Sequence, residues 1–165
     1  MILAFSDWVL DVDITVTIER SAEELRDHCM CGYCRNFYAA VDASYPDLRP
    51  FLAQFGIDVE APDELMPYTP TWYRAVYPVC GRILQQGGVV PVSDGLVIDF
   101  QTAEQCDVHT AMPQPNFFIT VEDISLPWVL DEPAEDVESA ANDPSFVQKI
   151  FDTMLRRDSN DITFS

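Results

Sequence analysis

The stretch "TWYRAVYPVCGRIL", residues 71–84, decides the fold class of this chain. It is rich in the β-branched and aromatic residues that suit a pleated, half-buried surface. Residues 89–100 and 116–130 have the same character, and Gly, Pro, Asp or Asn bounds each stretch. "QQGG" at 85–88 and "SDG" at 93–95 predict turns. We therefore predict several strands here, with Pro78 and Pro91 at sheet edges or bulges.

The N-terminal region predicts one strand and one short helix. Residues 8–19, "WVLDVDITVTIE", alternate between apolar and largely polar side chains, which is typical of a half-buried strand. Ser21, followed three residues later by Glu24, is a capping-box pattern that predicts a helix over residues 22–28.

Two further helices are predicted in the next segment. Cys31, Cys34, Phe37 with Tyr38, and Val41 recur at the spacing of one helix face. Residues 48–55 show a second apolar face, with Asp47 as N-cap and Gly56 as C-terminal stop. Residues 57–70 contain three prolines and no sustained period, so we predict a surface loop there.

This order of elements predicts an α+β fold: an N-terminal strand, a helical segment, a mainly antiparallel sheet and a C-terminal helix. The single domain spans residues 1–130. Residues 131–143, "DEPAEDVESAAND", are acidic and poor in large apolar groups, which predicts a linker. Residues 144–165 are predicted to form a C-terminal helix and tail, because Pro144 suits the first helical position after an Asp cap.

The charge of the chain restricts its partners. The formal net charge is −19, from 28 acidic and 9 basic side chains. Phosphate backbones and anionic lipids both require Lys and Arg, so nucleic acid and membrane surfaces are disfavoured. An acidic field attracts basic partners, which favours a protein partner. A nucleic-acid-mimicking decoy for a basic protein is an alternative interpretation.

Two features predict a cytoplasmic location. The first residues, "MILAFSDWVLDVD", do not have the basic region and long apolar region of a signal peptide. The chain contains five cysteines, an odd number that fits reduced thiols better than paired disulfides.

The segment "HCMCGYCRNF", residues 28–37, carries the clearest chemical signal, and one hypothesis is a structural zinc site. Zinc prefers thiolate and imidazole ligands in a tetrahedron. Cys31 and Cys34 form a C-x2-C pair, and Cys106 with His109 forms a C-x2-H pair, which together make a Cys3His set. Cys29 or His28 could substitute for a member of this set.

Two other interpretations of these cysteines stay open. "CGYC" is similar to the active-site tetrapeptide of thioredoxin-like proteins and bacterial disulfide isomerases, which implies thiol redox chemistry at Cys31 and Cys34. Alternatively, no cofactor is bound. Both thiols then behave as small buried hydrophobes that extend the apolar face of Phe37 and Val41, and this interpretation fits the pattern with the fewest assumptions.

Catalytic constellations are otherwise missing from the sequence: it has no Gly-rich phosphate loop and no G-x-S-x-G elbow. The sequence thus favours a binding or protein-interaction module over an enzyme, and either no cofactor or a structural zinc is compatible with it.

The cysteine-rich pattern H-C-x-C-x2-C-x-N-F, followed by "FLAQFGID" and "PDE", resembles that of a family of small uncharacterised bacterial proteins. The resemblance implies a bacterial cytosolic origin and assigns no catalytic residue. The residues that carry it are His28, Cys29, Cys31, Cys34, Asn36, Phe37, Phe55, Gly56, Ile57, Asp58 and Pro62.

Overall fold

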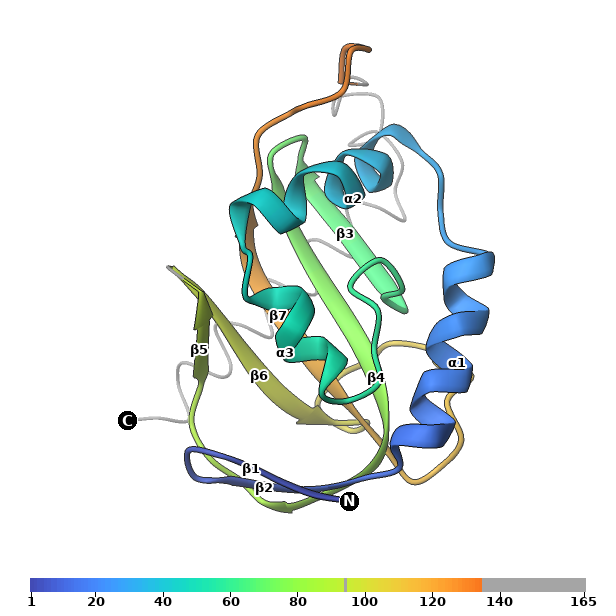
Figure 1. Ribbon diagram of the computed structural model, residues 1–165, viewed down its shortest axis with the longest axis vertical. Coiled ribbons are helices and arrows are strands. Elements are labelled where there is room, and N and C mark those ends of the chain that lie inside the picture. The colour runs from blue at the N-terminus through green and yellow to red at the C-terminus, as the bar shows by residue number, and fades with distance from the viewer. Residues whose placement is uncertain (94, 135–165) are drawn as a thin grey trace.

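A computed structural model describes residues 1–93 and 95–134, which form an antiparallel sheet with helices packed on it (Figure 1). The predicted α+β class and mainly antiparallel sheet are confirmed. The strands are β1 (Ile2–Phe5), β2 (Trp8–Val12), β3 (Glu64–Thr69), β4 (Trp72–Gln85), β5 (Val90–Ser93), β6 (Leu96–Thr102) and β7 (Asn116–Ser125). The helices are α1 (Ile14–Arg26), α2 (Gly32–Ser44) and α3 (Leu48–Ala53).

The strand predicted in residues 71–84 is confirmed as β4, which pairs with three other strands of the sheet. The strand order is β1-β2-β4-β7-β6-β5, and β3 also pairs with β4. Along one side, β4 pairs first with β3, up to Val76, and then with β2, from Gly81 onward. Pro78 lies between these two pairings, so its missing N–H removes no ladder bond on that side. On that side Pro78 is therefore at a local edge of the sheet, as predicted, although it lies in the middle of a long strand whose other side pairs with β7.

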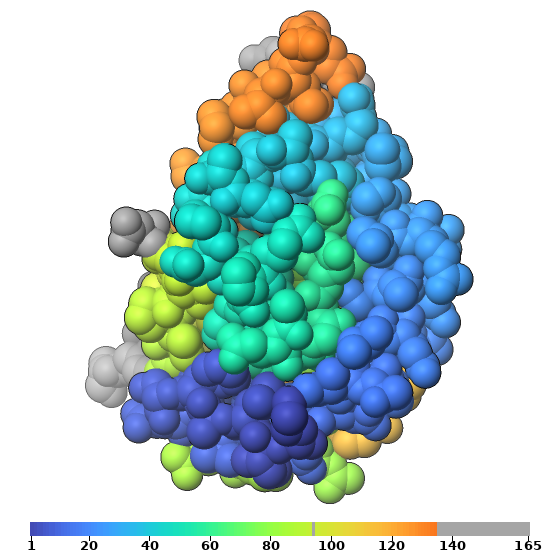
Figure 2. Space-filling view, in the orientation of Figure 1, coloured from blue at the N-terminus to red at the C-terminus, as the bar shows by residue number. Residues whose placement is uncertain are grey.

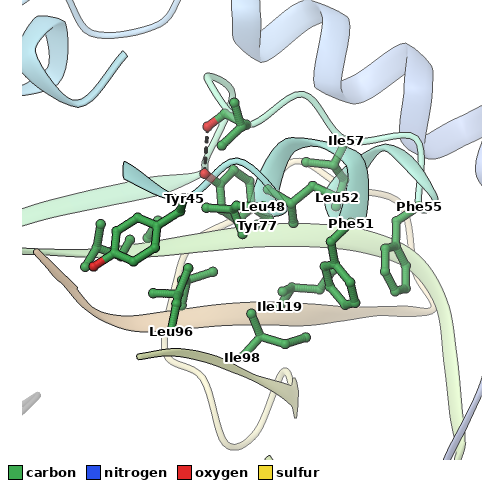
Figure 3. Packing of buried hydrophobic residues seen from close by; sticks show 14 of the residues in the cluster. Tyr45, Leu48, Phe51, Leu52, Phe55, Ile57, Tyr77, Leu96, Ile98 and Ile119 are labelled. Atoms are coloured by element: carbon green, nitrogen blue, oxygen red, sulfur yellow. Dashed lines mark hydrogen bonds between the residues drawn. The ribbon is translucent and has the colours of Figure 1, made fainter. Parts of the chain in front are cut away.

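The core lies between the sheet and helices α2 and α3. Figure 3 shows Leu48, Phe51 and Leu52 of α3 beside strand residues such as Ile119, with Tyr77 rising from β4. The Tyr77 hydroxyl is completely buried and donates a 2.6 Å hydrogen bond to the carbonyl of Val59. Figure 2 shows that α2, α3 and the following loop cover much of this face of the sheet.

The N-terminal prediction is wrong at the boundary between strand and helix. Strand β2 ends at Val12 instead of continuing to residue 19, and α1 begins at Ile14. Asp13 is the N-cap, because its side chain accepts a 3.1 Å hydrogen bond from the N–H of Val16. Local capping therefore overrides the strand propensity of the β-branched residues that follow.

The predicted capping box at Ser21 is also wrong, because Ser21 lies inside α1 and is buried. Its hydroxyl accepts a 2.9 Å hydrogen bond from the N–H of Asp58. Thr17, one turn earlier, is fully buried and accepts a 3.1 Å hydrogen bond from the N–H of Cys80 in β4. Helix α1 thus docks through hydroxyl groups, which an apolar-periodicity search does not detect.

Two other boundaries differ from prediction. The segment 57–70 is not loop throughout, because Glu64–Thr69 forms β3 on the edge of β4, where Pro67 is tolerated. Strand β7 ends at Ser125 and not at residue 130. Residues 126–134 contain no helix or strand.

The rest of the predicted acidic linker and the predicted C-terminal helix at 144–165 lie outside the described residues. Of the helices within residues 1–93 and 95–134, none has the length and apolar character that a membrane span requires.

Candidate metal centre

Three thiols lie close together at the connection between α1 and α2. Helix α1 ends at Arg26, and the chain runs through irregular residues to Cys31, which occupies the N-cap position of α2. Cys29 comes from the irregular segment, and Cys34 comes from the first turn of α2. The sulfur atoms of these three cysteines all lie within 4.8 Å of one another.

The anchoring of α2 holds this cluster in place. Asn36 is completely buried and bonds to the segment after β7: its Nδ2 donates to the carbonyl of Pro127 at 3.1 Å, and its Oδ1 accepts from the N–H of Val129 at 2.8 Å. Phe37 is buried in the main core. Polar and apolar contacts together therefore fix the helix turn that carries Cys34.

The thiols differ in exposure, which corrects part of the buried-thiol interpretation. Cys34 is 6% exposed, as expected for the apolar face of α2, but Cys31 is exposed, and so is Cys29. The N-cap residue has not yet entered the helix, so Cys31 does not share the direction of the residues one turn later. Two sulfur atoms therefore reach solvent above one buried sulfur atom.

The pKa values of Cys29 and Cys34 are shifted in opposite directions. Burial raises the pKa of Cys34 well above its ordinary value, and the neighbouring charge of Cys31 and the hydrogen bonds with Cys29 and Cys31 act in the same direction. For Cys29, burial acts to raise the pKa. The 3.5 Å hydrogen bond from the N–H of Cys31 and the bonds with the other thiols outweigh this effect, so the pKa of Cys29 lies below its ordinary value.

The cluster opens onto a pocket of about 350 Å³. Its walls include the three cysteines together with His28, Tyr38 and Asp63. The His28 ring stacks on Tyr38 with ring centres 4.5 Å apart and an angle of 9° between the planes. The hydroxyl of Tyr38 donates a 2.9 Å hydrogen bond to the carbonyl of Cys29. An imidazole, a phenol and a carboxyl group therefore border the thiols.

Asp63 lines the pocket with a carboxyl group whose pKa is strongly shifted. Burial raises the pKa of its carboxyl group to about 6, although Thr110 and His109 act in the opposite direction. Its Oδ2 atom is buried without a hydrogen-bond partner. Sequence reasoning missed Asp63, because no local pattern distinguishes this aspartate from the other acidic residues of the chain.

The structure places the two later members of the predicted zinc set elsewhere. Cys106 is buried and packs with Val76 and Phe118 in a small separate cluster. His109 is exposed, and its electrostatic contact is with Asp63. Among the described residues, the group of potential ligands that lie mutually close consists of Cys29, Cys31 and Cys34. Cys29, which the sequence offered as a substitute ligand, is thus the third member of the cluster with Cys31 and Cys34.

Zinc–thiolate geometry fits this cluster. In a tetrahedral site with Zn–S bonds of about 2.3 Å, sulfur atoms lie about 3.8 Å apart. Because the three sulfur atoms are already within 4.8 Å of one another, small side-chain movements would bring them to that spacing.

Comparison of the chain with protein-family models, curated proteins and solved structures gives no match. The function must therefore be inferred from the chemistry of this cluster.

Proposed function

We propose that this protein is a metal-binding interaction module in which Cys29, Cys31 and Cys34 together hold one zinc ion. The observation that carries the proposal is the approach of three sulfur atoms to within 4.8 Å. Thiolate ligands select soft or borderline metals such as zinc over calcium or magnesium, which prefer oxygen ligands.

The position of the cluster favours a structural role for this ion. Its ligands come from the irregular segment between α1 and α2 and from the first turn of α2. A metal ion would join these two parts and would restrict the one connection between the helices. Metal binding also requires the thiols to lose their protons, so zinc affinity would increase with pH.

We propose a basic protein surface as the partner. The chain carries a net charge of −19. Four of the arginines form salt bridges with carboxylates: Arg20, Arg35, Arg49 and Arg74. Arg49, for example, contacts Asp42, Asp58 and Glu60 at 2.9–3.4 Å. Acidic side chains outnumber basic ones by 28 to 9, so the uncompensated carboxylates would attract a basic partner.

The test is zinc content measured by elemental analysis after purification without chelator. We expect about one zinc ion per chain in the wild type and its loss in Cys31→Ser, a change at an exposed position that leaves the core intact. Cys80→Ser is the matched control, because Cys80 lies on β4 away from the cluster. The proposal is wrong if the reduced wild-type protein contains no metal and binds no added zinc.

One observation supports thiol redox chemistry as a second candidate: Cys29 is exposed and its pKa is lowered. The Cys29 thiolate would attack a disulfide of an oxidised partner and release one partner thiolate. Cys34 would then displace the second partner thiolate, so that a Cys29–Cys34 disulfide forms and the partner leaves as a dithiol. Zinc that protects Cys29 from alkylation until a chelator is added would favour the metal site over this reaction.

A further inference from the structure

Three thiolates leave one position of a zinc tetrahedron to be filled. Structural zinc sites are closed by a fourth protein ligand, whereas catalytic sites keep this position for water or substrate. The pocket beside the cluster is lined by one imidazole, that of His28, and by the carboxylates of Glu24, Asp27 and Asp63. The identity of the fourth ligand therefore decides which kind of site this is.

The hydrogen bond of His28 prepares its ring for metal binding. Nδ1 lies 3.3 Å from the carbonyl oxygen of Glu60. A carbonyl oxygen can only accept, so Nδ1 must carry the hydrogen of this bond. In the neutral ring, Nε2 then holds the free lone pair. Metal-bound histidines typically donate their other ring N–H to a carbonyl or carboxylate in this way.

Tyr38 connects the His28 ring to the thiols. The two rings are nearly parallel with centres 4.5 Å apart, which restricts the orientation of the imidazole. The Tyr38 hydroxyl also bonds to the carbonyl of Cys29, the residue that follows His28. One tyrosine on α2 thus contacts both the candidate ligand and the backbone of a cluster cysteine.

We propose that Nε2 of His28 is the fourth ligand and closes a Cys3His zinc site, an inference that rests on the proposed zinc binding by the three cysteines. Without the ion, the imidazole lies outside the group of ligand atoms that are mutually within 4.8 Å. Binding therefore requires residues 28–30 to move inward. These residues belong to no helix or strand, so they can move without disrupting either helix.

Asp63 is less able to take this role, because its backbone is tied to the sheet. Its N–H donates a 2.9 Å hydrogen bond to the carbonyl of Val76 on β4. Thr110 also bonds to its carboxyl group. Closing the site with Asp63 would require a shift of the start of β3 or of the cluster itself, whereas His28 moves with the segment that already carries Cys29.

A closed site predicts a specific role for the ion. Zinc would link the end of α1, through His28, to the start of α2, through Cys31 and Cys34. It would also leave no open position at which a water molecule or substrate could be activated. The inference thus assigns the centre a stabilising role and not a hydrolytic one.

The experiment measures zinc affinity, by competition with a chromophoric chelator, and the visible absorption of the cobalt-substituted protein. We expect His28→Ala to weaken zinc binding at least about tenfold and to shift the cobalt ligand-field bands, because an oxygen ligand replaces nitrogen. His28→Cys should restore tight binding, since four thiolates also form a tetrahedral site. His109→Ala is the matched control, because it removes the other histidine of the chain.

Several outcomes would overturn the inference. Unchanged affinity and an unchanged cobalt spectrum in His28→Ala would show that the imidazole is not a ligand. A loss confined to Asp63→Asn would assign the fourth position to the carboxylate. If the wild type binds zinc with three thiolates but His28→Ala behaves as His109→Ala does, only the fourth-ligand inference fails. If the wild type binds no metal, the proposed function fails as well.

Discussion

The partly buried carboxyl group of Asp63 makes the stability of the metal-free protein depend on pH, and Asp63→Asn should remove that contribution. Burial raises the pKa of Asp63 from its ordinary value of 3.8 to about 6. The unfolded chain releases this proton near pH 3.8, whereas the folded chain retains it until about pH 6. Because the folded state binds more protons in this window, the free energy of unfolding falls as the pH rises through it and stays lower above it.

The structure sets the size of this effect. The difference between 6 and 3.8 is 2.2 pKa units, and one unit corresponds to about 1.36 kcal/mol, so the upper bound is about 3 kcal/mol. The carboxyl group is only partly buried, and solvent screens part of this energy. We therefore expect Asp63 to lower the free energy of unfolding by about 1–2 kcal/mol at pH 7 relative to pH 4.

The assay is urea denaturation of the wild type and of Asp63→Asn between pH 4 and pH 7.5, with chelator and reductant present. The neutral amide cannot ionise, so the stability of Asp63→Asn relative to the wild type should rise by about 1–2 kcal/mol from pH 4 to pH 7. Asp7→Asn, in the exposed turn between β1 and β2, is the control and should show no comparable rise. If the difference in the free energy of unfolding between Asp63→Asn and the wild type stays constant with pH, the reasoning is refuted.

Two further predictions concern the sheet and the thiols. Gly81→Ala should lower the free energy of unfolding by about 2–4 kcal/mol in thermal melts, because Gly81 has φ +149° and an added Cβ would lie 2.0 Å from the carbonyl oxygen of Asp11. Gly88→Ala, whose Cβ would meet nothing within 4 Å, should change it little, and equal effects would contradict this account. In zinc-free protein at neutral pH, iodoacetamide should modify Cys29 before Cys34, because the lower pKa favours the reactive thiolate and burial protects Cys34. Mass spectrometry of timed samples measures this order. Equal modification rates for Cys29 and Cys34 would contradict the described difference in their pKa values and exposure.

Local patterns were sufficient to predict part of the fold and of the candidate site. The β-branched and aromatic content of residues 71–84 predicted β4, and the spacing of Cys34, Phe37 and Val41 predicted the buried face of α2. The C-x2-C spacing already indicated that Cys31 and Cys34 lie close together, although Cys31 is the N-cap residue and does not share the buried face of α2. These features depend on neighbours in the chain, which the sequence displays directly.

Other features depend on partners that are distant in the sequence, and only the tertiary structure decided them. Residues 14–19 alternate as a strand does, yet they form a helix whose Thr17 bonds to the N–H of Cys80, 63 residues away. The zinc hypothesis paired Cys31 and Cys34 with Cys106, but the path of the chain buries Cys106 against Val76 and Phe118 and brings Cys29 to the cluster instead.

The sequence by itself determined the α+β class, the acidic charge and the place of the thiol-rich segment, because composition and short spacings encode them. Which thiols meet, and which carboxyl group is partly buried beside them, was decided by the tertiary structure, which brings residues of α1, α2 and β3 to one pocket. Burial and desolvation arise from atoms contributed by several elements at once, so no single stretch of residues specifies them.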